Sequence, residues 1–135
     1  MQIQPYLHFD GTCEAAFKLY EKVLGGKLSL MTHGNSPEAD KVAPEWKDKI
    51  LHAHLAVGDA VVMGSDVPPQ YFSKPQGFSV SIMIKDPAAA ERIFNGLAEK
   101  GTVKMPFQQT FWAYRFGMLE DQFGIPWMVD CEKPA

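Results

Sequence analysis

The sequence has few of the features that mark secreted, membrane-spanning or nucleic-acid-binding proteins. Only two of its 135 residues are cysteines, Cys13 and Cys131, and this pair is typical of free thiols in a reducing compartment. No apolar run approaches the roughly 20 residues that span a bilayer. The first residues, MQIQPYLHFDG, lack a basic start followed by an apolar stretch, so we expect no secretory signal. We therefore expect a soluble, cytoplasmic protein.

Positive charge is scarce and is not clustered. The chain has 13 basic and 16 acidic residues, and a formal net charge of -3. Nucleic acids and anionic membranes need a concentrated positive field, so we expect neither as a partner. The sequence also lacks a Gly-rich phosphate loop, a dinucleotide-binding fingerprint and a serine nucleophile elbow. Nothing in it looks like the parallel-sheet site that usually binds S-adenosylmethionine.

Two strand–helix units of matching length are present instead. The strand YLHFD ends at Asp10, and the amphipathic segment CEAAFKLYEKVL closes on Gly25. Later, SVSIMIK ends at Asp86, and a second amphipathic segment closes on Gly101 after the same interval. We expect Thr12 and Asp86 to accept hydrogen bonds from the first turns of the helices, and Gly25 to end the first helix in the left-handed conformation.

A third strand and a hairpin are expected after each helix. The third strands are predicted over residues 27–32 and 102–107, and the hairpins turn at Gly58-Asp59 and around residues 120–124. Each half is then β-α-β-β-β. A single half leaves one face of its sheet bare, so we predict an α+β fold in which two such modules form a concave mixed sheet with the helices outside. The single domain divides into module one (1–66), a linker (67–76) and module two (77–131).

This arrangement and three segments resemble a known superfamily. PYLHFDGTCEAAFKLYEKVLGGKL, LHAHLAVGDAVVMGSD and FGMLEDQFGIPWMVD resemble PhnB-like proteins, some of which are labelled as related to a 3-demethylubiquinone methyltransferase. These proteins belong to the vicinal-oxygen-chelate (glyoxalase/bleomycin-resistance/dioxygenase) superfamily. The resemblance covers nearly the whole chain, and the motif Asp-x-Phe-Gly-x-x-Trp is its most distinctive part. It implies a small-molecule pocket on the concave face of the sheet.

Strand alternation predicts which side chains line that pocket. Successive residues of a strand face opposite sides, and Leu7, Phe9, Ala53 and Leu55 are the set expected to face a helix. The opposite set can be pocket wall, hydrogen-bonded structural histidines, or aromatic core. The predicted pocket residues are Gln4, Tyr6, His8, His52, His54, Ser79, Trp112, Tyr114, Phe116 and Met128.

The resemblance also implies four positions that hold a divalent ion in the metalloenzymes of the superfamily. They correspond to Gln4, His52, Ser79 and Met128. His52 is a strong ligand and Gln4 a weak candidate, whereas a neutral hydroxyl and a soft thioether suit a hard divalent ion poorly. We therefore expect no complete metal site and no cofactor. His54 and His8 could add nitrogen ligands, so a divalent metal ion stays an alternative.

A nucleophile is harder to identify. Cys13 falls in the first turn of a helix, where the helix dipole can lower the pKa of a thiol. No His and Asp pair can be assigned to it, and a small packed residue is the alternative that we favour. Catalytic residues therefore stay unassigned, and whether the chain is an enzyme stays open.

Three functions are compatible with these residues. The first is a metal-free PhnB-like protein that binds a small molecule. The second is a metal-dependent lyase, isomerase or dioxygenase anchored by His52, and the third is a drug-sequestering resistance protein. Residues 33–49 and 64–77 form long loops with aromatic side chains, among them Trp46 and Tyr71. Relatives commonly pair two chains, so we predict a two-fold symmetric homodimer that buries part of residues 64–77, with a lid as the alternative.

Overall fold

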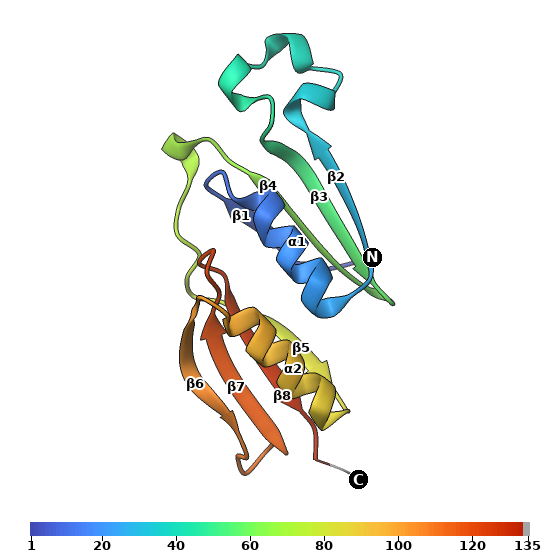
Figure 1. The fold of residues 1–135 in the computed structure, drawn as a ribbon, viewed down its shortest axis with the longest axis vertical. Coiled ribbons are helices and arrows are strands. Elements are labelled where there is room, and N and C mark those ends of the chain that lie inside the picture. Colours follow the sequence, from blue (N-terminus) through green and yellow to red (C-terminus); the bar gives the residue numbers. More distant parts are fainter. Residues whose placement is uncertain (134–135) are drawn as a thin grey trace. The chain divides into compact units, whose positions relative to one another are not determined.

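A computed structural model describes residues 1–133 of the chain. They form two compact units, one made of residues 1–73 and the other beginning at residue 74. Each unit has one four-stranded mixed sheet and one α-helix that packs on it (Figure 1). The predicted α+β fold of two β-α-β-β-β modules is confirmed.

The first unit has strand order β1-β4-β3-β2, in which β1 and β4 are parallel and the other neighbours are antiparallel. Three short 3-10 helices interrupt the loop after β2, and a fourth follows β4. The elements are β1 (Tyr6–Phe9), α1 (Cys13–Leu24), β2 (Lys27–Thr32), η1 (His33–Asn35), η2 (Ala39–Lys41), η3 (Pro44–Trp46), β3 (Ile50–Val57), β4 (Ala60–Asp66) and η4 (Pro69–Tyr71).

The second unit repeats this connectivity, with strand order β5-β8-β7-β6 and a parallel β5–β8 pair. Its elements are β5 (Val80–Ile84), α2 (Pro87–Ala98), β6 (Thr102–Gln108), β7 (Arg115–Glu120) and β8 (Pro126–Cys131). The expected third strands are present in both units, and β6 runs one residue further than predicted.

One expected strand begins later than the sequence pattern suggested. Trp112 and Tyr114 were placed on the strand that became β7, but β7 starts at Arg115. The reason is a turn that closes on itself: Thr110 N donates to Ala113 O at 3.3 Å, and Ala113 N donates to the Thr110 hydroxyl at 3.1 Å. These bonds satisfy the backbone locally, so the strand pairing cannot extend through these residues.

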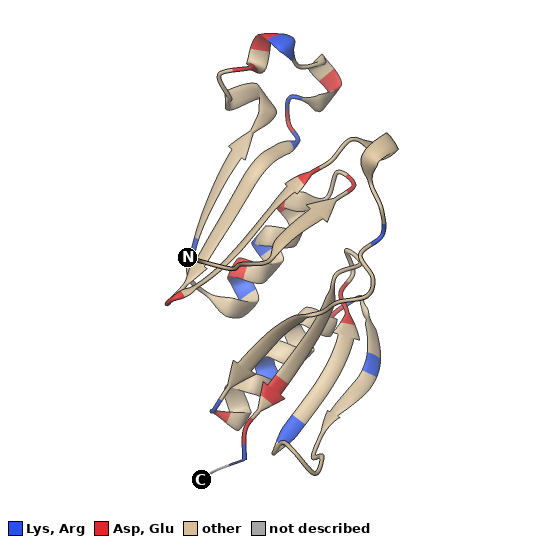
Figure 2. Ribbon diagram, turned by 180° about the vertical axis from the view of Figure 1, so that it is seen from behind, with Lys and Arg blue, Asp and Glu red and all other residues tan. Residues whose placement is uncertain are grey.

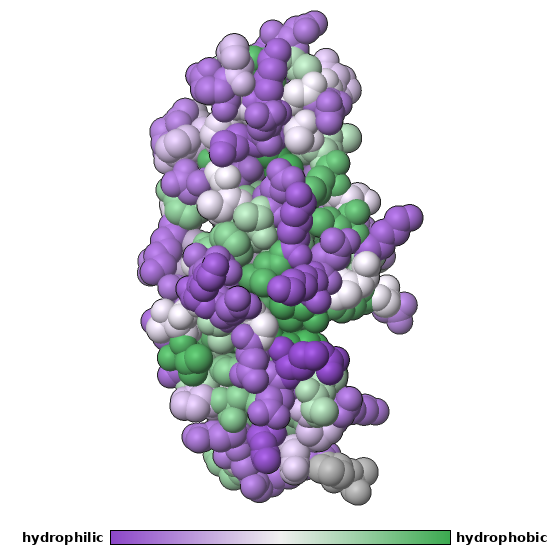
Figure 3. Space-filling model, viewed as in Figure 1, coloured by the Kyte–Doolittle hydropathy of each residue, from purple (hydrophilic) through white to green (hydrophobic). Residues whose placement is uncertain are grey.

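The core of each unit lies between its helix and its sheet. Phe17 and Tyr20 of α1 are fully buried, and their rings meet edge to face at 5.4 Å. Phe94 and Leu97 occupy the same place on α2. Burying a large apolar side chain contributes about 1.5–3 kcal/mol to folding, so this layer holds each helix in place. The solvent side of the helices is hydrophilic (Figure 3).

The two helices begin with different caps. Asp86 caps α2 as expected, accepting from Ala88 N at 3.2 Å. Thr12 precedes α1, but its side chain makes no capping hydrogen bond. Asp66, at the end of β4, supplies the acceptor instead. Its Oδ1 accepts a hydrogen bond from Cys13 N, and its Oδ2 accepts one from Ile50 N, both at 2.9 Å. The expectation for Thr12 was therefore wrong, because a buried carboxylate from a distant strand occupies the helix N-terminus.

The helix C-termini also differ. Gly25 ends α1 with a φ of 76°, positive as predicted, but its ψ of -158° lies outside the left-handed helical conformation that we expected. After α2 a positive φ falls on Lys100, with φ of 60°. Gly101 has another role, since a Cβ there would lie 2.4 Å from the Glu120 carbonyl oxygen. Its lack of a side chain lets the start of β6 approach the end of β7 closely.

The Asp-x-Phe-Gly-x-x-Trp motif builds the turn between β7 and β8. Asp121 is buried, and its Oδ1 accepts from Phe123 N at 2.8 Å and from Ile125 N at 3.0 Å. Its Oδ2 accepts from the indole Nε1 of Trp127 at 2.9 Å. One carboxylate therefore shapes the turn and fixes the largest side chain of the core. The most distinctive motif of the sequence is structural.

We expect Asp121→Asn to lower the free energy of unfolding by about 2–3 kcal/mol, because an amide NH2 replaces one acceptor oxygen among buried N–H donors. Urea denaturation checks this. Asp59→Asn is the matched control, since Asp59 occupies the exposed turn of the other hairpin and its substitution should cost no more than about 0.5 kcal/mol. Equal losses in the two variants would show that the motif does not stabilise the fold.

Candidate functional site

The face of the first sheet opposite α1 carries a cluster of one tyrosine and three histidines. Tyr6 and His8 come from β1, and His52 and His54 come from β3. The Tyr6 hydroxyl lies 3.3 Å from His52 Nδ1. Ring centroids are 5.5 Å apart for Tyr6 and His8, 5.8 Å for Tyr6 and His52, and 6.4 Å for the histidines of β3. Because β4 lies between β1 and β3, Tyr6 reaches His52 across an intervening strand.

The electrostatic character of this face follows from the strand register. Its side chains are those that alternate with the buried, helix-facing set. Among the described strand positions on this side there is no carboxylate; they are Tyr6, His8, Lys27, Ser29, Met31, His52, His54, Ala56, Val61, Met63 and Ser65. Figure 2 shows the acidic residues of this unit near strand ends, in loops and on the helix. The face is therefore rich in hydrogen-bonding groups that carry no negative charge.

The Tyr6–His52 contact also influences how His52 can act. When the tyrosine hydroxyl donates to Nδ1, the proton of the neutral imidazole sits on Nε2. His52 then presents an N–H toward whatever occupies the face. Its neighbours His8 and His54 can each donate or accept through a ring nitrogen. Such an arrangement can orient a polar group of a small molecule.

The corresponding face of the second sheet is rich in sulfur and also carries the carboxylates of Glu120 and Asp130. Phe116 and Met118 of β7 and Met128 of β8 lie on it, with Met118 directly opposite Met128. Phe116 is only 6% exposed, and the Trp112 ring packs edge-on against it at 5.4 Å. Trp112 remains 48% exposed. This wall can contact an aromatic or aliphatic group but offers few hydrogen bonds.

The structure groups the predicted pocket residues only in part. Tyr6, His8, His52 and His54 come together in the first unit, and Trp112 contacts Phe116 in the second. Other residues of the prediction lie outside the strands: Gln4 precedes β1, Ser79 precedes β5, and Trp112 and Tyr114 precede β7.

Tyr114 has a distinct environment. The Arg115 guanidinium lies 4.4 Å from the centre of its ring, and the same side chain donates to the Tyr114 carbonyl at 3.0 Å. Arg115 is half-buried over this ring. A stacked guanidinium covers one face of Tyr114, which limits what else that face can contact.

Several residues of these faces were not predicted. Met63 and Ser65 on β4 share a side with the Tyr6 cluster, and Met118 and Asp130 share a side with Phe116. The period-two alternation in AVVMGSD and RFGMLE identifies them once the buried set is known.

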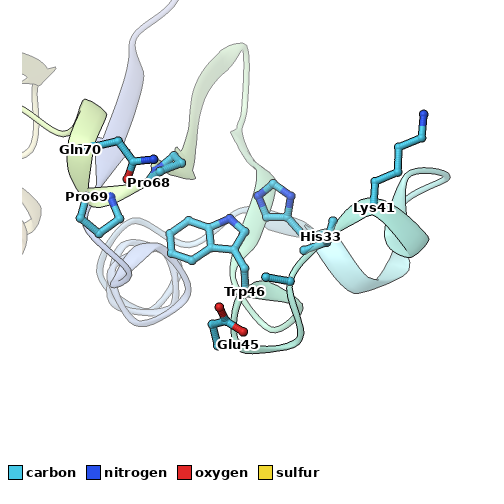
Figure 4. A pocket seen from close by; sticks show the side chains of 9 residues that line it. His33, Lys41, Glu45, Trp46, Pro68, Pro69 and Gln70 are labelled. Carbon is cyan, nitrogen blue, oxygen red and sulfur yellow. The ribbon is translucent and has the colours of Figure 1, made fainter.

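A separate cavity of about 430 Å³ lies in the first unit where the loop after β2 meets the segment after β4 (Figure 4). His33 and Trp46 stand beside each other there, with ring centroids 6.0 Å apart. The lining residues are His33, Lys41, Val42, Ala43, Glu45, Trp46, Pro68, Pro69 and Gln70. The two long loops noted in the sequence therefore contribute to a common surface.

Cys13 does not have the properties of a nucleophile. The residue is fully buried beneath α1. Burial, followed by the nearby charges of Asp66 and Glu14, raises the pKa of its thiol far above the ordinary value. Burial is also the first cause of the raised pKa of Cys131. Cys13 is the small packed residue that we favoured, since burial and acidic neighbours outweigh the helix dipole.

Within the described part of the chain, residues 1–133, no three His, Cys, Asp or Glu side chains converge in a way that could hold a metal ion. None of its helices has the length and apolar character needed to cross a bilayer.

Known proteins resemble this chain over almost its whole length. A family profile described as 3-demethylubiquinone-9 3-methyltransferase matches residues 1–130. Protein YjdN of Escherichia coli K12 is 32% identical over 142 residues, covering 98% of this chain and 97% of YjdN. The crystal structure of PA1353 from Pseudomonas aeruginosa has 47% identity and a TM-score of 0.91, and 99% of each chain is covered.

More distant structures share the fold. A Bacillus cereus protein described as a putative 3-demethylubiquinone-9 3-methyltransferase, PhnB protein, is 21% identical with a TM-score of 0.80, covering 97% of this chain and 99% of its own. A glyoxylase/bleomycin resistance protein/dioxygenase domain from Frankia sp. EAN1pec is 12% identical with a TM-score of 0.66, and 98% of each chain is covered.

The raised pKa of Cys13 predicts a loss of stability at alkaline pH. A folded pKa above the unfolded value gives stability that is complete below the unfolded pKa, about 8.5, and is lost as pH rises beyond it. Near pH 10 this loss should reach about 2 kcal/mol. Urea denaturation at about pH 8 and pH 10 should therefore show a smaller decline in Cys13→Ala than in the wild type. The same decline in both proteins would contradict a raised pKa of Cys13.

Proposed function

The chain belongs to the PhnB-like family of the vicinal-oxygen-chelate (glyoxalase/bleomycin-resistance/dioxygenase) superfamily, and from that membership we propose that it binds a small organic molecule on the open face of a sheet, without a complete catalytic metal site. Each unit directs its helix to one side of the sheet and leaves functional side chains on the other. Small-molecule sites usually combine an apolar lining with a few placed polar groups.

The Tyr6–His52 contact is the observation that carries this proposal. Ordering polar side chains costs free energy. A tyrosine that reaches across β4 to a histidine on a half-exposed face serves no evident packing purpose. With His8 and His54 beside it, the pair gives a ligand several hydrogen-bonding partners. In the second unit, the wall of Phe116 and Met128 by itself suits an aromatic or aliphatic group. We therefore favour a ligand that is partly aromatic or amphipathic.

The four positions that bind metal in the enzymes of the superfamily do not fit a divalent ion here. They offer one imidazole, one carboxamide, one neutral hydroxyl and one thioether, from His52, Gln4, Ser79 and Met128. Structural and catalytic sites for hard or borderline divalent ions use several imidazoles, thiolates or carboxylates. His52 Nδ1 is also close to the Tyr6 hydroxyl, and Gln4 Nε2 lies 3.4 Å from the Gln2 side-chain oxygen. The proposed function therefore includes no chemical step that uses a metal ion.

We also propose that the protein works in the cytoplasm. Its two cysteines are free, and each is buried in the core of its own unit. A disulfide would need both thiols to leave these packed positions, whereas reduced thiols are the ordinary state in the cytosol.

Binding predicts that a small molecule accompanies the purified protein. Native mass spectrometry should show an added organic mass, and His52→Ala should weaken its retention by about tenfold, the loss expected when a polar ligand group loses a partner. His33→Ala is the matched control, because His33 lies beside Trp46 and not in the cluster. Retention should be unchanged in that variant.

Elemental analysis of the same dialysed protein separates this proposal from a metal-dependent enzyme. We expect less than one divalent ion per chain. One tightly held ion that is lost in His52→Ala would reverse the proposal and favour a lyase, isomerase or dioxygenase. Tight retention of an added drug without turnover would instead identify a sequestering protein.

We further propose that two chains associate through the loop segments of the first unit. Trp46, Pro68 and Pro69 line one cavity there, and Tyr71 is 76% exposed. Aromatic side chains in exposed loops are typical of interfaces, since they bury a large area at small entropic cost. The alternative is a lid that folds over the ligand of its own chain.

Light scattering at micromolar concentration should therefore give about twice the chain mass of 15.1 kDa. Tyr71→Asp should shift the equilibrium toward monomer, because it places a charge in an apolar contact. Asp59→Asn provides a control at a turn of the same unit. A monomer mass for the wild type would exclude the dimer and leave the lid.

A further inference from the structure

The methionines of this chain are segregated by position in the fold. Of the seven methionines, all but Met1 lie on strands, one per strand, and every one of these is on the sheet face opposite the helix. None belongs to the buried core, which is built mainly from branched aliphatic, aromatic and alanine side chains. Met31 and Met63 lie in the first unit; Met83, Met105, Met118 and Met128 lie in the second.

Three of them form a continuous row across the second sheet. Met105 of β6 is directly opposite Met118 of β7, which is directly opposite Met128 of β8. These are neighbouring strands in the sheet (Figure 1). Directly opposed residues of antiparallel strands have Cβ atoms about 4.5–5.5 Å apart. The row therefore places three thioether side chains next to one another on one face.

A register shift in β6 completes the row. Val103 pairs with Leu119, and an unbroken ladder would place Lys104 opposite Met118. The irregularity between Val103 and Met105 brings Met105 into that position instead. Bulges often re-aim a side chain near a functional site. Here the shift replaces a cationic side chain with a thioether.

The three side chains can converge on one point. Methionine has an unbranched side chain with three rotatable bonds, so sulfur atoms from adjacent strands can approach a common centre. Met105 is 37% exposed, and Met118 and Met128 are half-buried. All three side chains are therefore partly accessible to solvent.

We propose that Met105, Met118 and Met128 form a binding site for a soft monovalent metal ion of the Cu(I) class. Neutral thioethers are soft donors that favour Cu(I) and bind Mg²⁺, Mn²⁺ or Zn²⁺ poorly. Two carboxylates share the same face: Asp130 lies two residues from Met128 along β8, and Glu120 ends β7. Their charge favours a cation near the row, although Glu120 also pairs with Lys74 at 3.4 Å.

This site differs from the divalent site of the metalloenzymes in donor type, and it goes beyond the proposed ligand binding. Met128 is unsuited to a hard divalent ion, but it matches a soft one. The buried Cys131 is not part of the set, because its side chain is on the helix side of β8. Either proposal can fail without affecting the other.

Silver ion, in chloride-free buffer, is a redox-stable probe of the same class. The full chain is labelled with ¹³C at the methionine methyl groups and titrated with Ag(I). We expect the methyl signals of Met105, Met118 and Met128 to shift together and to saturate at one ion per chain. Met31 and Met63 should not follow them. Residue-resolved signals keep any silver bound at a cysteine thiol separate. Zinc and magnesium ions should leave all of these signals in place.

Met118→Leu removes the central sulfur and conserves the shape of the side chain. It should weaken silver binding by about tenfold or more, because removing even a supporting group of a metal site costs that much affinity. Met63→Leu, the same exchange in the other unit, should leave the titration unchanged. Met105→Leu gives a second test if the first variant folds poorly. Independent or non-saturating shifts of the three signals would overturn the site. So would unchanged silver binding in the folded Met118→Leu or Met105→Leu variant.

Discussion

The buried carboxylate of Asp66 joins three elements of the first unit. It terminates β4, accepts the first backbone N–H of α1 and accepts the first N–H of β3. Hydrogen bonds to a charged acceptor in a low-dielectric core are strong, and leaving these donors unpaired would be costly. This contact ties the start of α1 to the buried side of the sheet. The opposite side, with Tyr6 and His52, is therefore free for polar chemistry.

The second unit reaches a similar result by other means. Asp86 caps its helix locally, while Asp121 organises the β7–β8 turn and holds the indole of Trp127 in the core. The two modules share one connectivity, but their buried carboxylates lie at different positions along it. In each case the carboxylate stabilises the helix side of the sheet. The open side of the second unit is lined by thioethers and aromatic rings, in contrast to the imidazoles of the first.

The sequence predicted the fold and most of the face assignments, because strand alternation and helix periodicity are local properties. It placed His52 and His54 on one side of β3 and Leu55 on the other. It failed where a contact spans the chain, as with the capping of α1 by Asp66, or where a short turn competes with a strand, as at Thr110. No local pattern encodes the first event, whereas the second is a local turn that overrides the strand alternation. The Tyr6–His52 contact was also invisible, since it depends on β4 inserting between β1 and β3.

Buried and open positions alternate along each strand, so its two sides have separate roles. On β3, residues such as Ala53 and Leu55 maintain the packing under α1, while His52 and His54 between them carry the chemistry. Substitutions at the open positions can alter what the surface recognises without disturbing the packed side. One scaffold of this kind can accumulate new specificities in small steps. The contrast between the histidine face and the methionine face shows how far two copies of one module can diverge while the backbone connectivity is kept.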